Sequence, residues 1–283
     1  MGERMRLEPN LPPRPANAAM TRRPPAAFGP GCLAWLLLAW LLLALAACAT
    51  GPQRAALPWR DAEQLVLVVV PDWNATAGEL RRYERRGAGW REIDAAVPVA
   101  IGRNGAAWGA GLHPARSDGP QKREGDGRAP AGVFALGTAF GYAGRAATAL
   151  PYRGTTASDW CIDVPASPLY NRIVDAREAG SDAVAGSTEP MRRDLHANGD
   201  PRYRLGFVIG HNPGNRPGAG SCIFAHLWRA PGEPTAGCTA MAEPAMRALL
   251  GWLDPRRRPV FVLLPQAEYG RLRHAWDLPE TAP

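Results

Sequence analysis

The sequence has little lysine: Lys122 is the only one, and the other thirty-two of its 33 basic residues are arginines. No run of five to eight basic residues occurs, although the formal net charge over 283 residues is +7. Nucleic-acid-binding proteins usually concentrate basic residues in such a cluster, so we expect no nucleic-acid partner. With 46% hydrophobic and 21% charged residues, the composition also excludes a wholly disordered chain.

The spacings typical of zinc sites are also missing. No H-x-x-x-H or H-x-H pattern is found, so we expect no metal and no other cofactor. A zinc site built from distant residues stays open as an alternative, and it would make the protein a metallopeptidase of the cell wall. Its ligands would be His196, His211 and His226 with Asp194 or Asp200. Cys238 would then have no function.

The apolar run Cys32–Ala47 has sixteen residues without a charge, which is short for a membrane-spanning helix of about twenty residues. It follows Arg22 and Arg23, and this arrangement is typical of a bacterial export signal. The run ends in Leu-Ala-Ala-Cys48, which resembles the lipobox of bacterial lipoproteins. That resemblance implies lipidation of Cys48; an uncleaved membrane anchor is the alternative.

These features divide the N-terminal region into a lipoprotein signal segment, residues 1–47, and a polar tether, residues 48–61. Lipidated Cys48 would then attach the protein to a membrane. By analogy with known sorting rules, Ala49 in place of an aspartate favours the outer membrane. We therefore expect a lipoprotein of the cell envelope that faces the periplasm.

The remaining chain alternates short apolar segments with turn-forming residues, which predicts a mainly β sandwich or barrel. The expected strands are Gln64–Val70, Leu80–Arg86, Trp90–Ile93, Pro98–Ile101, Gly132–Leu136, Trp160–Val164, Phe207–Ile209, Ser221–Trp228 and Val260–Leu264. The second and third flank Gly87-Ala88-Gly89 and suggest a hairpin. A helix is expected after Pro244, where Met246, Leu249, Leu250 and Leu253 form a stripe of helical period. Residues 105–131 and 171–204 are expected to be long polar loops.

Three cysteines follow the signal segment and Cys48. In an oxidising compartment, Cys161, Cys222 and Cys238 allow at most one disulfide and leave at least one thiol. For Cys161 and Cys222 we expect two buried thiols, with a disulfide as the alternative.

His226 and Cys238 are candidates for catalysis. His226 ends an apolar segment, and Cys238 follows a Gly- and Pro-rich loop that can return the chain to the same place. A cysteine attacks as the thiolate, and a neighbouring imidazole can act as its base. Gly237 lacks a Cβ, so its N–H and that of Cys238 could approach an oxyanion closely. The alternative is a buried structural cysteine and a strand-end histidine.

The segment from His226 to Met241 (HLWRAPGEPTAGCTAM) resembles the active-site motif of L,D-transpeptidases with a YkuD-like domain. In that motif a histidine precedes [Ser/Thr]-x-Gly-Cys by a dozen or so residues, and Thr235, Gly237 and Cys238 match it. Residues 124–134 look like the family's T-P-x-G-x-F stretch. Two positions depart from the pattern: Ala236 and Ala240 stand where many members carry His and Arg.

The resemblance covers residues 62–265, and residues 266–283 would be a C-terminal tail. It implies a compact β-sandwich or barrel with a helix following the nucleophile. It also implies a peptidoglycan L,D-transpeptidase that forms a thioester on Cys238, with His226 as the base. A peptidoglycan L,D-hydrolase using the same site and a non-catalytic peptidoglycan-binding lipoprotein remain the alternatives.

Four residues are candidates for contacts with the stem peptide: Arg229, Thr235, His211 and Asn212. Arg229 would pair with the donor carboxylate, because guanidinium suits such a contact; the alternative is a surface arginine. His211 and Asn212 could line the cleft or simply form a turn. The other three histidines, His113, His196 and His274, are expected to be solvated.

Overall fold

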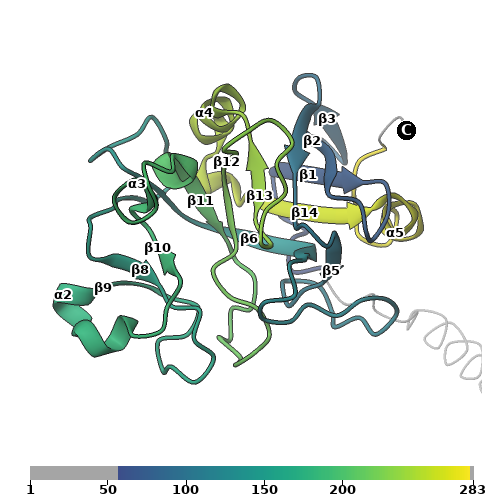
Figure 1. The fold of residues 1–283 in the computed structure, drawn as a ribbon. Coiled ribbons are helices and arrows are strands. Elements are labelled where there is room, and N and C mark those ends of the chain that lie inside the picture. The colour runs from purple at the N-terminus through teal and green to yellow at the C-terminus, as the bar shows by residue number, and fades with distance from the viewer. Residues whose placement is uncertain (1–56, 281–283) are drawn as a thin grey trace, which may run out of the picture. The chain divides into compact units, whose positions relative to one another are not determined.

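The computed structural model describes residues 57–280, which are mainly β: strands account for 33% and helices for 16% (Figure 1). The expected signal segment, Cys48 and the first part of the tether lie outside the described residues.

Eight strands form a closed barrel. In their order around the barrel they are β1 (Gln64–Val70), β14 (Val260–Pro265), β6 (Ala129–Gly141), β11 (Leu205–Ile209), β12 (Phe224–Leu227), β13 (Thr239–Met241), β4 (Val97–Ala100) and β2 (Ala77–Arg86). The barrel closes because β2 pairs with β1 as well as with β4. The prediction of a mainly β, barrel-like fold is therefore confirmed.

Strands β1 and β14 lie side by side in parallel, with Val66 opposite Phe261. Every residue of β14 and all but one of β1 are buried. Apart from Gln64 at the start of β1, both strands are apolar, because strands covered on both faces have no solvent side for polar residues.

The hairpin predicted around residues 87–89 forms between β2 and β3 (Gly89–Glu92). Arg86 pairs with Gly89 across the turn, and Gly87 takes a φ of +57°, a conformation that glycine adopts without steric cost. Two further strands, β5 (Ala106–Trp108) and β7 (Tyr152–Gly154), extend β6 outside the barrel path.

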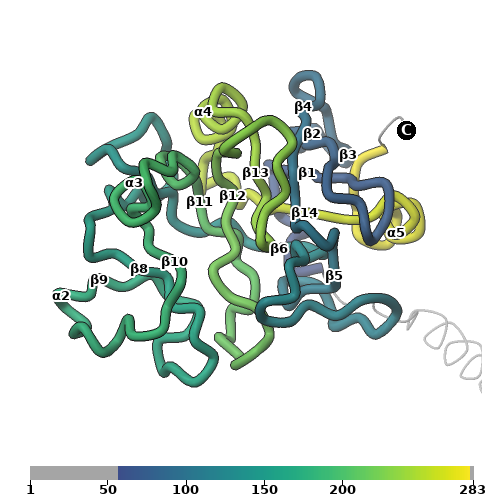
Figure 2. The backbone as a smooth tube through the Cα atoms, viewed as in Figure 1, coloured from purple at the N-terminus to yellow at the C-terminus, as the bar shows by residue number. Residues whose placement is uncertain are grey.

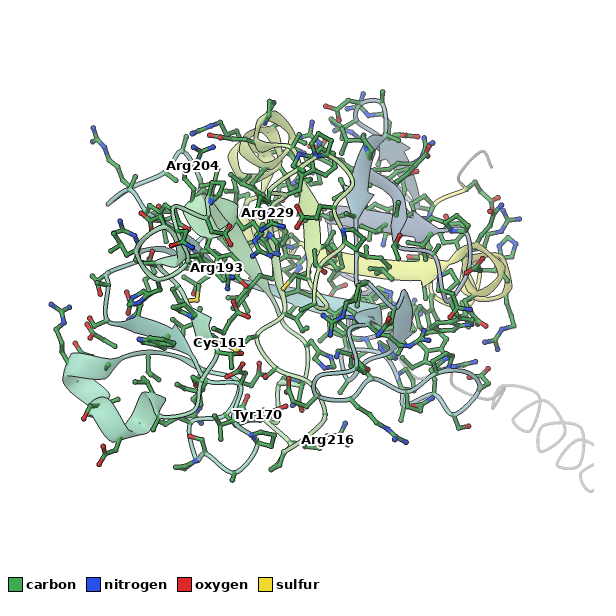
Figure 3. All side chains as sticks on the ribbon, viewed as in Figure 1. Cys161, Tyr170, Arg193, Arg204, Arg216 and Arg229 are labelled. Atoms are coloured by element: carbon green, nitrogen blue, oxygen red, sulfur yellow. A yellow bond between two sulfur atoms is a disulfide. The ribbon has the colours of Figure 1, made fainter. Side chains whose placement is uncertain are left out.

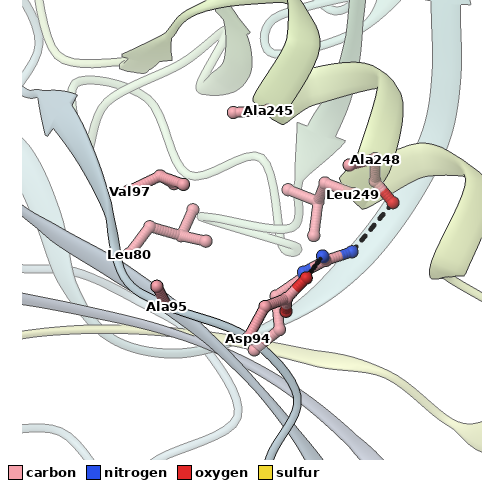
Figure 4. Close-up of a pocket in the computed structure, with 8 residues that line it drawn as sticks. Leu80, Asp94, Ala95, Val97, Ala245, Ala248 and Leu249 are labelled. Atoms are coloured by element: carbon pink, nitrogen blue, oxygen red, sulfur yellow. Dashed lines mark hydrogen bonds and ion pairs between the residues drawn. The ribbon is translucent and has the colours of Figure 1, made fainter.

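Helix α4 (Glu243–Trp252) forms in the segment with the apolar stripe and buries Met246, Leu249 and Leu250. Arg82 of β2 links the helix to the barrel. The Arg82 guanidinium donates to the carbonyl of Ala248 at 2.9 Å and forms an ion pair with Asp94 (Figure 4). A cavity of only about 50 Å³ remains between helix and strand, so the contact is close.

The packed domain extends past residue 265. Helix η3 (Pro255–Arg257) precedes β14, and α5 (Gln266–Leu272) follows it directly. Leu272, Trp276 and Leu278 are buried in the main core, and the indole N–H of Trp59 donates to the carbonyl of Trp276 at 2.9 Å. Residues 266–280 therefore belong to the packed domain and are not the separate C-terminal tail that was expected.

A small lobe, defined here as residues 155–204, packs beside β11 and β12 (Figures 1 and 2). Its elements are β8 (Asp159–Cys161), β9 (Ile173–Asp175), α2 (Ala176–Ala179), η1 (Ser181–Val184), β10 (Glu189–Pro190), α3 (Arg193–His196) and η2 (Arg202–Arg204). Strands β10, β8 and β9 form a separate sheet, so the expected loop from 171 to 204 has a structure of its own.

A disulfide joins this lobe to the barrel. Cys161 of β8 is bonded to Cys222, which lies just before β12, and Cys238 is the free cysteine of the described residues. The expectation of two buried thiols at 161 and 222 is therefore wrong. The two cysteines are 61 positions apart, and their contact depends on how the lobe docks, which no local pattern encodes.

Candidate functional site

The pairing of β12 with β13 places His226 and Cys238 on the same face of the barrel wall. The two strands are parallel, with Ala225 opposite Thr239 and His226 opposite Ala240, so Cys238 is level with Phe224. Side chains alternate along a strand: Ala225 faces the main core, whereas Phe224 and Cys238 belong to a second apolar cluster under the lobe. His226 lies two positions beyond Phe224 on β12, so its side chain is on the same sheet face as those of Phe224 and Cys238.

Both side chains line one cavity of about 290 Å³ between the barrel and the lobe. The barrel and its loops contribute Arg103, Lys122, Glu124, Gly125, Ser221, Cys222, Ile223, His226, Thr235, Ala236, Gly237 and Cys238, and the lobe contributes Asp163, Thr188, Glu189, Arg193, Arg202 and Tyr203. In Figure 3, Arg193 and Cys161 mark the lobe side of this region. The lobe therefore forms one wall of the site.

The hydrogen bonds of His226 define its tautomer. Its Nδ1 lies 2.7 Å from the carbonyl oxygen of Leu227, and a carbonyl only accepts, so Nδ1 carries the proton. Nε2 then holds the lone pair, and no hydrogen-bond partner contacts it within residues 57–280. Burial lowers the pKa of His226 to about 4, so the ring is neutral at pH 7. A neutral imidazole with Nε2 available can accept a proton.

The Cys238 side chain is nearly enclosed, with 7% of the residue exposed. Its Sγ accepts from the N–H of Phe224 at 3.3 Å and donates to the carbonyl of Cys222 at 3.5 Å. Burial raises the pKa of the thiol to about 12, and the charge of Glu189 acts in the same direction. The resting pair is therefore a neutral thiol and a neutral imidazole, and the thiolate in which a cysteine attacks is not preformed.

Thr235 ties the loop before Cys238 together. Its hydroxyl donates to the carbonyl of Cys238 at 2.7 Å and accepts from the N–H of Gly237 at 3.0 Å. The Gly237 N–H that we expected to face an oxyanion is thus engaged in the resting structure. Thr235 lines the cavity but is buried. Its main contribution is therefore to stabilise the loop that carries Cys238, through the two hydrogen bonds of its hydroxyl.

Arg229 does not line the cavity, contrary to its expected role. Its side chain is 60% exposed and pairs with Glu233 four residues later, Nε to Oε2 at 3.1 Å. The segment turns outward after β12, so a residue three positions beyond His226 faces solvent instead of the site.

His211 and Asn212 are also structural, contrary to their assignment to the cleft. His211 is buried and bridges two loops: Nδ1 accepts from the N–H of Ala110 at 3.3 Å, and Nε2 donates to the carbonyl of Ala219 at 2.9 Å. Asn212 has a φ of +50° and closes the same loop by bonds to Arg216 and Gly220. Neither residue lines the cavity.

Four cations line the cavity, and none of them was predicted: Arg103, Lys122, Arg193 and Arg202. They lie on loops and lobe segments far from Cys238 in sequence, so no local spacing connects them with the nucleophile. One signal was present for Lys122, the chain's only lysine, which is buried and pairs with Asp126 at 2.5 Å.

The remaining histidines differ in environment. His196 and His274 are exposed, as expected, whereas His113 is buried against Trp276 and Phe134, and burial lowers its pKa. The expectation that His113 is solvated is wrong. Within residues 57–280, no group of three or more His, Cys, Asp or Glu side chains is placed to hold a metal ion.

Comparison of the chain with models of known protein families, with curated proteins and with solved structures finds no match. In the part of the chain that the structure describes, no helix has the length and apolar character needed to cross a lipid bilayer.

Proposed function

We propose that the protein is a cysteine-dependent L,D-transpeptidase that acts on peptidoglycan stem peptides through a thioester on Cys238. The observation that carries the proposal is the common position of Cys238 and His226: one sheet face, one cavity, and an imidazole whose Nε2 lone pair is available. In this proposal the barrel is L,D-transpeptidase-like, and α4 is the helix that follows the nucleophile.

The first step transfers the acyl group to the enzyme. The thiol proton of Cys238 passes to Nε2 of His226 as the sulfur attacks the carbonyl carbon of the peptide bond before the terminal D-alanine. The C–N bond then breaks, His226 returns the proton to the leaving amine, and D-alanine departs. A thioester between Cys238 and the shortened stem peptide remains.

The resting protonation states define what substrate binding must achieve. Since thiol and imidazole are both neutral, proton transfer has to accompany attack instead of preceding it. The N–H of Phe224 already points at Sγ and stabilises negative charge there, since it lowers the thiol pKa against the larger effect of burial. For the Gly237 N–H to serve an oxyanion, its bond to Thr235 must be exchanged.

The second step releases the enzyme. An amine from a second stem peptide attacks the thioester carbonyl, and His226 takes up the amine proton. The C–S bond then breaks, and His226 passes that proton to the sulfur, which leaves as the regenerated thiol. One amide replaces another, so the exchange needs no ATP. This suits the proposed location in the cell envelope, where lipidated Cys48 would hold the enzyme on a membrane.

Two alternatives use the same cavity. Water in place of the second amine would make the protein an L,D-hydrolase, because both reactions share the thioester. A non-catalytic peptidoglycan-binding lipoprotein is favoured by one observation, the high pKa that burial gives to the Cys238 thiol.

The reaction products test the proposal. The purified protein, incubated with a stem tetrapeptide and an amine acceptor, is expected to release D-alanine and form a cross-linked peptide, whereas a hydrolase yields D-alanine and free tripeptide without a cross-link. His226→Gln should lower the rate by roughly 100- to 10,000-fold, because it removes the base. His196→Gln, at an exposed histidine, is the matched control and should leave the rate unchanged. Absence of D-alanine release by the wild type would contradict the proposal.

A further inference from the structure

Three of the four cations that line the cavity are already neutralised by carboxylates. Lys122 pairs with Asp126 at 2.5 Å, Arg193 with Asp200 at 2.9 Å, and Arg202 with Asp200 through its Nε at 2.9 Å. Arg103 is exposed and has no carboxylate within ion-pair distance among residues 57–280. It is thus the cavity cation with charge available for a ligand.

The cavity carboxylates have partners as well. Glu124 accepts from the hydroxyls of Tyr170 and Ser221, and Asp163 from Thr188. Glu189 accepts from the hydroxyl of Tyr203 at 2.7 Å and from Arg193 at 3.1 Å. None of the three pairs with Arg103. An incoming anion can therefore bind there without displacing an internal ion pair.

The backbone of Arg103 is fixed to the nucleophile loop. Its N–H donates to the carbonyl of Thr235 at 2.8 Å, and the N–H of Thr235 donates back to the carbonyl of Ile101 at 2.8 Å. The hydroxyl of Thr235 in turn holds the carbonyl of Cys238. One hydrogen bond therefore connects Arg103 with Thr235 and a second connects Thr235 with Cys238, although Arg103 and Cys238 are 135 positions apart in sequence.

The side chain of Arg103 also rests on a defined surface. A Cβ placed on Gly127 would come within 3.1 Å of its Cγ and 3.2 Å of its Cζ, so the side chain lies along that glycine. Gly102 holds the neighbouring backbone close to the same loop, because a Cβ there would approach the carbonyl oxygen of Gly127 to 2.4 Å. The contact with Gly127 on one side reduces the conformational freedom that the arginine loses on binding an anion.

We propose that Arg103 binds the terminal carboxylate of the acyl donor, and thus selects stem peptides that end in a free carboxylate. The inference rests on the proposed function and names the specificity residue of that site. A guanidinium forms strong, charge-assisted hydrogen bonds with a carboxylate. It fills the role expected of Arg229, which pairs with Glu233 outside the cavity.

The test is a binding measurement that does not depend on turnover. In a Cys238→Ala background, calorimetric titration compares the tetrapeptide acid with its C-terminal amide, with and without Arg103→Gln. Arg103→Gln should weaken binding of the acid about 10- to 100-fold and leave binding of the amide unchanged. Arg229→Gln is the matched control and should change neither Kd, and Arg103→Lys should restore part of the affinity for the acid.

In the catalytically intact protein, Arg103→Gln should raise KM for the acid by a similar factor and change kcat little. An equal loss on acid and amide, or an unchanged Kd for the acid, would overturn the role of Arg103 while D-alanine release still supports the proposed function. Absence of binding of either peptide to the Cys238→Ala protein would overturn both proposals.

Discussion

Loss of the disulfide between Cys161 and Cys222 is expected to destabilise the domain by about 4 kcal/mol. The bridge closes a loop of 61 residues, and the chain-entropy relation for a loop of that length gives about 4 kcal/mol at 25 °C. With a urea dependence of about 2 kcal/mol/M, the unfolding midpoint should fall by about 2 M.

The same change should loosen the site. The carbonyl of Cys222 accepts the hydrogen bond from Sγ of Cys238, and the lobe that the bridge holds forms one wall of the cavity. Without the bridge we expect iodoacetamide to alkylate Cys238 faster, because the lobe opens more often.

Urea unfolding followed by circular dichroism provides the assay, on oxidised wild type, on wild type reduced with a phosphine, and on the Cys161→Ala/Cys222→Ala variant. The last two should have similar midpoints, both below that of the oxidised protein. Peptide mapping without reduction should recover the two cysteines in one linked pair. Equal midpoints before and after reduction would show that the disulfide does not stabilise the domain.

Three further predictions concern the protonation and bracing of the site. His226 and His211 both have a pKa of about 4 in the native state because of burial, against about 6.5 when unfolded. Between pH 6.5 and 4 the unfolded chain therefore binds more protons than the native protein. The free energy of unfolding should fall as the pH falls, by about 3 kcal/mol for each histidine. A urea midpoint that stays constant from pH 7 to 4.5 would contradict this prediction. The alkylation rate of Cys238 should rise about tenfold per pH unit from pH 7 to 10 because its pKa is about 12, whereas a plateau below pH 8 would indicate a preformed thiolate. Thr235→Val should lower the free energy of unfolding, measured in urea, by roughly 1–3 kcal/mol, because the Gly237 N–H and the Cys238 carbonyl lose the Thr235 hydroxyl as their partner. Thr235→Ser keeps the hydroxyl and should recover most of that stability.

Local sequence encodes the parts of the fold that a short window can specify. The apolar runs at 64–70 and 260–264 became β1 and β14, and the stripe after Pro244 became α4. Strand β6 is longer than predicted: it spans thirteen residues and includes Pro130 and Gly132, which usually interrupt strands. Gly132 is required there because the His113 ring occupies the space where a Cβ would lie.

The cavity lining depends mostly on contacts between segments that are far apart in the sequence, so local patterns predicted only part of the site. The spacing of His226 and Cys238 suggested a shared location, and the parallel pairing of β12 with β13 provides it. The role of Arg229 was inferred from its nearness in sequence, but the side chain faces solvent. Arg103 reaches the site through its backbone bond to Thr235, a contact that no pattern within either segment predicts.

Intact mass spectrometry after incubation with a stem tetrapeptide tests the thioester on Cys238 most directly. We expect a mass increase equal to the tetrapeptide minus D-alanine, located on Cys238 by peptide mapping and removed by hydroxylamine. The Cys238→Ala protein should gain no mass. An unmodified wild type, or the same adduct on the Cys238→Ala protein, would exclude Cys238 as the nucleophile.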